Sequence, residues 1–202
     1  RKDLLELALK YYEQFIAERA DDPLLQADLA EATMRVGRIT REIGSREEAL
    51  KTVQLALSMY RKLVGECPDV LDYQDRLAAG YNSLRALQRA MGRPDEALVS
   101  CQKAIDIQKK LVAGNSDVLE YQARLAGSYM NLGLLQGETG KGDEALVSSQ
   151  KAIDIREKLV AGNPDVLEYQ AGLAVSYSNL GTLLQEDLRT RDEAVPFFQK
   201  AI

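Results

Sequence analysis

The hydrophobic residues of this chain recur at intervals of three and four, which is the spacing of amphipathic helices. Near the N-terminus, one such stripe consists of Leu4, Leu5, Ala8, Tyr11, Tyr12 and Phe15. The same spacing continues to the C-terminus, and we therefore expect an all-α fold of nine antiparallel helices. They are expected at residues 1–19, 22–43, 46–64, 69–91, 94–113, 117–139, 142–161, 165–187 and 191–202.

The pattern also repeats along the chain. Residues 97–138 and residues 145–186, which lie 48 positions apart, are identical at 32 of 42 positions without a gap. Repetition of this length indicates an array in which each unit packs mainly on its neighbours. We expect one solenoid domain that begins with the second helix of a partial repeat. Its parts are residues 1–20, then repeats at 21–67, 68–115 and 116–163, and a truncated repeat at 164–202.

Capping residues indicate where the helices begin and end. Four pairs have the spacing of capping boxes, in which a side chain accepts a hydrogen bond from the first turn. They are Ser45 with Glu48, Asp117 with Glu120, Asp165 with Glu168, and Thr190 with Glu193. Gly65, Gly114 and Gly162 are placed to end helices in the left-handed conformation.

Residues at fixed positions in each unit carry a family resemblance. In the third unit they are Tyr129, Leu132, Gly133, Gly140, Ala145 and Ala152, and similar residues recur in the other three. This spacing resembles the tetratricopeptide repeat, which implies a right-handed α-α superhelix. The usual period of that family is 34, so the longer period should lengthen both helices. Long-period arrays of this kind resemble those linked to some bacterial serine/threonine protein kinases and to kinesin light chain.

The differences between the two best copies are concentrated on one helix face. Ten positions differ between the two copies, and six of them lie in the helix expected at residues 117–139. Five of the six are spaced three or four residues apart, which places them on one face of that helix. The family resemblance places that stripe on the concave wall, where a peptide would bind. The candidate peptide-binding residues on and beside it are Arg35, Arg38, Asn82, Arg89, Arg124, Met130, Asn131 and Asn179. Alternatively, a face without packing constraints has drifted after duplication.

Two residue types favour binding on this wall. An Asn amide offers both a donor and an acceptor, so Asn131 and Asn179 could hold the main chain of an extended peptide. Arginine binds carboxylate or phosphate bidentately, which suits an acidic ligand. Alternatively, the Asn residues are ordinary surface residues, and Glu31 with Arg35 and Arg38 with Glu42 are i,i+4 surface pairs.

Composition excludes several functions. The net charge of −5 argues against a nucleic-acid partner. No apolar run approaches the ~20 residues that span a bilayer, so no membrane partner and a cytoplasmic location are expected. Histidine is absent, and we expect neither a metal site nor a cofactor. In repeat register Cys67 and Cys101 lie too far apart for a disulfide, so both are expected as buried, free thiols.

These observations predict a non-enzymatic scaffold that binds an extended peptide or a partner helix in its groove, an acidic peptide being one candidate. Two alternatives remain. The chain, which does not begin with Met, could be the regulatory or substrate-recruiting arm of a larger enzyme, such as a serine/threonine kinase. It could also self-associate through the exposed ends of the array.

Overall fold

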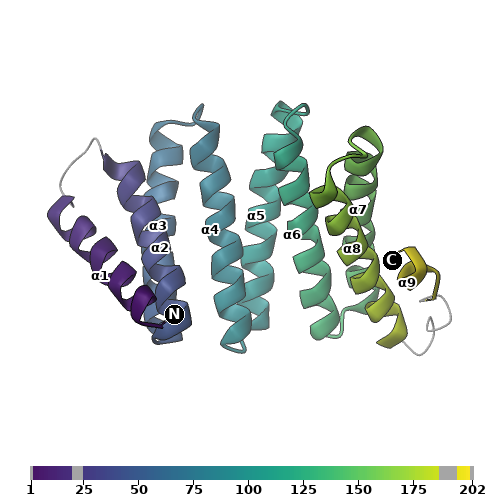
Figure 1. Ribbon diagram of the computed structural model, residues 1–202, viewed down its shortest axis with the longest axis horizontal. Coiled ribbons are helices and arrows are strands. Elements are labelled where there is room, and N and C mark those ends of the chain that lie inside the picture. The colour runs from purple at the N-terminus through teal and green to yellow at the C-terminus, as the bar shows by residue number, and fades with distance from the viewer. Residues whose placement is uncertain (1, 20–24, 187–194, 201–202) are drawn as a thin grey trace. The chain divides into compact units, whose positions relative to one another are not determined.

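A computed structural model describes residues 2–19, 25–186 and 195–200 of the chain, and its regular elements are all helices (Figure 1). They are α1 (Lys2–Arg19), α2 (Gln26–Ile43), α3 (Arg46–Glu66), α4 (Leu71–Ala90), α5 (Pro94–Gly114), α6 (Leu119–Glu138), α7 (Gly142–Gly162), α8 (Leu167–Glu186) and α9 (Val195–Lys200). The all-α prediction is confirmed. Full-length helices number eight in the described residues rather than the expected nine, and the described part of α9 is six residues long.

The chain forms two compact units, Arg1–Ile107 and Gln108–Ile202, and the boundary between them falls within α5. In the first unit, α1 packs on α2, α2 on α3 and α3 on α4, and α2 also touches α4 (Figure 1). In the second unit, α6 packs on α7, α7 on α8, and α6 also touches α8. We call α2, α4, α6 and α8 the first helices of their repeats. The surface that two adjacent first helices of one unit form together is called the first-helix face.

Small residues allow the two helices of a repeat to approach closely. A Cβ atom on Gly37 of α2 would lie 2.7 Å from Val53 Cγ2 on α3. In the second unit, a Cβ on Gly133 of α6 would lie 2.6 Å from Ser149 Oγ on α7. Both distances are too short for a methyl group, so these positions require glycine.

Successive repeats also meet at a small residue. A Cβ on Gly80 of α4 would lie 2.7 Å from Leu57 Cδ2 and 2.9 Å from Met34 Cε. Met34 and Leu57 are buried and belong to the apolar core of the first unit. The core of the second unit includes Ile153, Tyr177, Leu180 and Leu184.

Of the predicted capping boxes, one caps its helix and two do not. Ser45 caps α3, where its Oγ accepts a hydrogen bond from the Glu48 N–H at 3.4 Å. The expected boxes at Asp117 and Asp165 do not cap, since α6 begins at Leu119 and α8 at Leu167. Gln122 Nε2 instead donates to the Ser116 carbonyl at 2.7 Å and closes the turn before α6. The fourth expected box, Thr190 with Glu193, lies outside the described residues.

The predicted glycine stops were also wrong. Gly65, Gly114 and Gly162 lie within the last residues of their helices, and none of them has positive φ. The glycines with positive φ are Gly92 (71°) and Gly140 (76°), in the tight turns between the two helices of a repeat. Asparagines just after two helices take the capping role: the side-chain amide of Asn115 donates to the Leu111 carbonyl and that of Asn163 to the Leu159 carbonyl, both at 3.1 Å.

Both cysteines are free thiols, as predicted, but only one is buried. Cys101 is fully buried, and burial raises the pKa of its thiol to about 11, with the Arg85 charge opposing the shift. Cys67 is exposed because it follows α3 at the helix end rather than facing the next repeat. Among the described helices, none is both long enough and apolar enough to cross a membrane.

Candidate functional site

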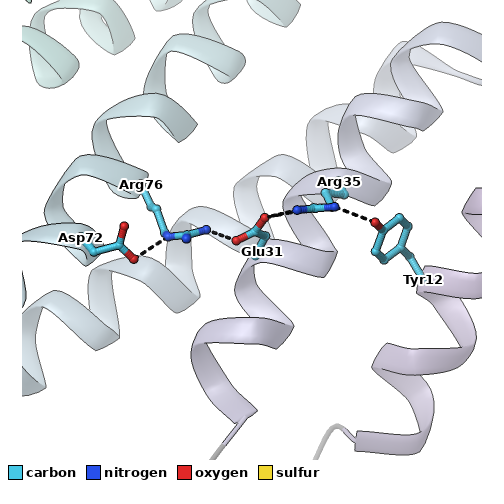
Figure 2. Close-up of polar contacts among 5 residues, drawn as sticks. All are labelled: Tyr12, Glu31, Arg35, Asp72 and Arg76. Carbon is cyan, nitrogen blue, oxygen red and sulfur yellow. Dashed lines mark hydrogen bonds and ion pairs between the residues drawn. The ribbon is translucent and has the colours of Figure 1, made fainter. Parts of the chain in front are cut away.

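Charged side chains of three helices are joined in one network on the first unit (Figure 2). Arg35 on α2 donates from Nη1 to the Tyr12 hydroxyl on α1 at 2.8 Å and from Nε to Glu31 at 3.0 Å. The other oxygen of Glu31 is paired with Arg76 on α4. Arg76 Nε is in turn 2.6 Å from Asp72 Oδ2. The network therefore runs from α1 across α2 to α4.

Glu31 is the centre of this network because it is shared by two guanidinium groups. Its side chain is 31% exposed, against 44% for Arg35 and 39% for Arg76. Partly exposed ion pairs contribute little stability individually. Their main effect is to hold Arg35 and Arg76 in fixed orientations on the first-helix face.

A cavity of about 120 Å³ lies beside Glu31, between α2 and α4. Tyr60 on α3 lies at its base and is 2% exposed. The other lining residues come from the two first helices: Glu31, Met34, Arg38, Arg76, Ala79, Gly80 and Ser83. Two arginines and one glutamate give this cavity a net positive charge.

Tyr60 and Arg38 are the lining groups best placed to meet a ligand. Burial, and secondarily the charge of Asp72, raises the pKa of Tyr60 to about 12, so its hydroxyl remains protonated at neutral pH. Arg38 is exposed, and no ion pair or hydrogen bond joins it to another described residue. A neutral donor and an available cation therefore face the same small cavity.

A second cavity, of about 260 Å³, lies between α1 and α2 and is bordered by Tyr11, Tyr12 and Phe15. Forty-eight residues later the equivalent positions are Met59, Tyr60 and Leu63. Leu63 is buried in the core of the first unit. The aromatic rings of this cavity thus occupy positions that pack against a neighbouring helix elsewhere in the array, and we interpret the cavity as an uncovered packing face.

Four of the eight predicted site residues lie in the first unit and four lie in the second. Arg35, Arg38, Arg89 and Arg124 are exposed, whereas Asn82, Asn131 and Asn179 are half-buried. Of the eight, Arg38 lines the cavity beside Tyr60. Arg35 is bound to Glu31, and Arg124 Nε lies 2.9 Å from Glu120 Oε1. Arg35 therefore forms the expected i,i+4 pair with Glu31, and Arg124 forms a pair of the same spacing with Glu120. The other expected pair, Arg38 with Glu42, is not formed.

The prediction for Met130 was wrong. Its side chain is only 4% exposed and belongs to the core, as does that of Met34 at 8%. Both positions come from the variable stripe, which is therefore not a uniform surface. A side chain at this position of a first helix lies against the first helix of the next repeat. Met34 on α2, for example, lies close to Gly80 on α4.

Sequence reasoning missed Tyr60 and its equivalents because it considered first helices alone. Tyr60, Gln108 and Arg156 occupy the same register, 48 residues apart, on second helices. Position 108 and its copy 156 are among the ten mismatches between the best repeats. That mismatch, one of three among the ten that lie on the second helix, was the available signal.

Comparison with known proteins agrees with this architecture. Residues 125–165, which include most of α6 and all of α7, match the family model described as a tetratricopeptide repeat. Residues 125–165 are thus similar to a tetratricopeptide repeat. Because residues 97–138 are closely identical to residues 145–186, this similarity extends to the neighbouring repeat.

Solved tetratricopeptide-like arrays share the fold of this chain. A Podosopora anserina protein assigned as a kinesin light chain with nearly identical TPR-like repeats is 19% identical, with a TM-score of 0.63 over 98% of this chain and 85% of that one. MamA is 20% identical, with a TM-score of 0.53 over 98% of this chain and 86% of that chain. No curated protein matches the sequence.

Proposed function

We propose that this tetratricopeptide array is a non-enzymatic interaction module that binds an acidic, extended peptide on its first-helix face. The observation that carries the proposal is the cavity beside Glu31, where Arg38 has no acidic partner among the described residues and Tyr60 presents a protonated hydroxyl. A carboxylate of the peptide would accept hydrogen bonds from both groups.

The surroundings of the cavity support an ordered site. Arg76 and Glu31 are already paired, so one wall is fixed before a ligand arrives. Preorganised donors bind more tightly because less side-chain entropy is lost on association. In the second unit, Asn131 on α6 and Asn179 on α8 are half-buried, and their amides would hold the main chain of an extended peptide. Arg89, which is exposed at the end of α4, would extend the positive surface.

The proposal is tested by selecting binders from a display library of twelve-residue random peptides on the whole 202-residue chain. We expect enrichment of sequences with Asp or Glu, and loss of their binding in the Arg38→Glu variant. Lys51→Glu is the matched control because it makes the same change in charge at an exposed position of α3. Equal binding by the chain and by Arg38→Glu would contradict the assignment of the cavity.

Self-association is a second proposal, based on α1. Its Leu7 and Tyr11 are each 66% exposed, which is unusual for large apolar side chains. A second copy could cover this face. Sedimentation velocity at micromolar concentrations should then show species heavier than 22.4 kDa, and Tyr11→Ser should remove them. A single 22.4 kDa species across the concentration range would exclude this proposal.

A further inference from the structure

Arg156 on α7 is a half-buried arginine that reaches the adjacent first helix α8. Its Nη1 group donates to the Gly172 carbonyl at 2.5 Å and also to the Ser176 hydroxyl. The Nε atom lies 3.4 Å from where a Cβ on Gly172 would be. The guanidinium therefore lies against α8, in the space left by the missing side chain of Gly172.

No carboxylate neutralises this cation among the described residues. The two nearest acids along α7 are engaged elsewhere, since Asp154 accepts from Gln150 at 2.7 Å and Glu157 accepts from the Tyr177 hydroxyl. Desolvation lowers the pKa of Arg156, and no acid opposes that shift. Burying a cation without an acidic partner is costly. We therefore expect the Arg156 guanidinium to bind a negatively charged group from outside the chain.

The repeat shows which surface Arg156 belongs to. Arg156 has the register of Tyr60, which lies at the base of the cavity on the first unit. Its two contacts, Gly172 and Ser176, have the register of Arg76 and Gly80, which line that cavity. Arg156 therefore occupies, within the second unit, the place between first helices that Tyr60 occupies in the first.

The neighbourhood differs from that of Tyr60 in the residues that close the site. Gly127 and Gly172 occupy, two repeats later, the positions of Glu31 and Arg76. The ion pair that forms one wall of the first cavity is thus absent here, and a Cβ on Gly127 would meet nothing within 4 Å. Open space lies where Glu31 would be, so an acid supplied by a partner has room to approach.

We propose that Arg156 is an oxyanion-binding residue that takes a carboxylate of an acidic peptide lying on α6 and α8. The Nε and Nη2 groups have no hydrogen-bond partner among the described residues, and together they form a fork that matches a carboxylate bidentately. This inference rests on the proposed function and adds a site for an acidic peptide within the second unit. It places the contact on a second helix, outside the variable stripe of the first helices.

The competing explanation is internal. Arg76 pairs with Asp72 and Arg124 with Glu120, each four residues earlier on its helix. In the last repeat the acid is kept as Glu168, but the arginine is replaced by Gly172. Arg156 could then serve as a substitute partner for Glu168. No ion pair joins these two residues in the structure, and Glu168 is exposed.

The test follows the side-chain Nε–H resonance of Arg156 by NMR in the whole chain during titration with hexaglutamate. We expect a saturable shift of this resonance and about tenfold weaker binding in Arg156→Gln, which introduces the residue found at position 108. Glu168→Gln is the matched control and should bind hexaglutamate at least as tightly as the unchanged chain. Inorganic phosphate, titrated separately, should produce a weaker shift than hexaglutamate.

Three results would overturn the inference: no shift of the Arg156 resonance, equal affinity in Arg156→Gln, or a shift with phosphate but none with hexaglutamate. A shift of the same resonance on Glu168→Gln without ligand would identify the internal pair and would also overturn it. Because the resonance reports on Arg156 alone, the Arg38→Glu variant separates the two proposals. Retention of the Arg156 shift in that variant supports this site whatever happens at the cavity of the first unit.

Discussion

Ser100 Oγ donates to Gln88 Oε1 at 2.6 Å, and 48 residues later Ser148 Oγ donates to Gln136 Oε1 at 2.7 Å. Each glutamine also donates from Nε2 to a glutamate at the start of the second helix, Glu96 at 3.3 Å and Glu144 at 3.1 Å. A buried polar clamp thus joins the two helices of a repeat.

Breaking one partner of the clamp should destabilise the fold. Ser148→Ala leaves the buried Gln136 oxygen without its donor, and we expect the free energy of unfolding to fall by about 1–3 kcal/mol. Adding Gln136→Leu to that variant should restore part of the loss, since both polar partners are then removed. Urea denaturation measures both effects. Ser58→Ala, at an exposed position of α3, is the control and should change stability by less than about 0.5 kcal/mol.

Two glycines of α6 should respond in opposite directions to the same substitution. A Cβ on Gly133 would lie 2.6 Å from Ser149 Oγ and 3.0 Å from the Ala145 carbonyl oxygen. Gly133→Ala should therefore cost about 1–3 kcal/mol through overpacking. Gly127→Ala meets open space and should stabilise the helix by about 0.5–1 kcal/mol, because alanine is the better helix former. Thermal unfolding of the pair checks both signs, and equal shifts would contradict the packing described at Gly133.

Replacing the shared acid Glu31 should have a salt-dependent effect. Glu31→Gln removes the negative charge between Arg35 and Arg76, and we expect a loss of about 0.5–1 kcal/mol at low salt. The loss should shrink in 1 M salt, because exposed charges are screened. Glu120→Gln, which breaks one exposed pair with Arg124, should cost less. Denaturation at two salt concentrations makes the comparison, and a salt-independent loss would mean that Glu31 stabilises by packing.

Stability should decline in alkali partly because of Tyr60. Its pKa is about 12 in the folded protein, above the usual 10. The raised pKa means that the contribution of the neutral phenol is fully present below pH 10 and is lost as the pH rises through 12. Tyr60→Phe should make the decline in unfolding free energy between pH 9 and 11 shallower. Tyr11→Phe alters an exposed ring and should leave the slope unchanged.

The helical array could be predicted because its signal is distributed over many residues. Hydrophobic spacing recurs along every long helix, and an error at one position does not alter the period. Helix ends depend on single residues, and there local patterns misled. Gly114 was expected to terminate α5 in a left-handed conformation, but the Asn115 side chain caps the final turn instead.

The candidate site was predicted less well because exposure depends on the neighbouring helix. Met130 and Arg124 lie on the same stripe, yet the first is buried and the second is exposed. One sequence does not show how deeply the next repeat covers a given turn. Tyr60 and Arg156 were missed for the same reason, since their role follows from the gap between two first helices rather than from their own helix.

The length of the first helices would limit the size of the peptide that we propose to bind on a first-helix face. Helices α4, α6 and α8 have 20 residues each, which corresponds to about 30 Å of axis. An extended segment rises about 3.3 Å per residue, so a peptide running lengthwise has room for roughly nine residues before it passes the helix ends. A peptide that crosses from one first helix to the next spans 8–10 Å, the reach of only about three residues.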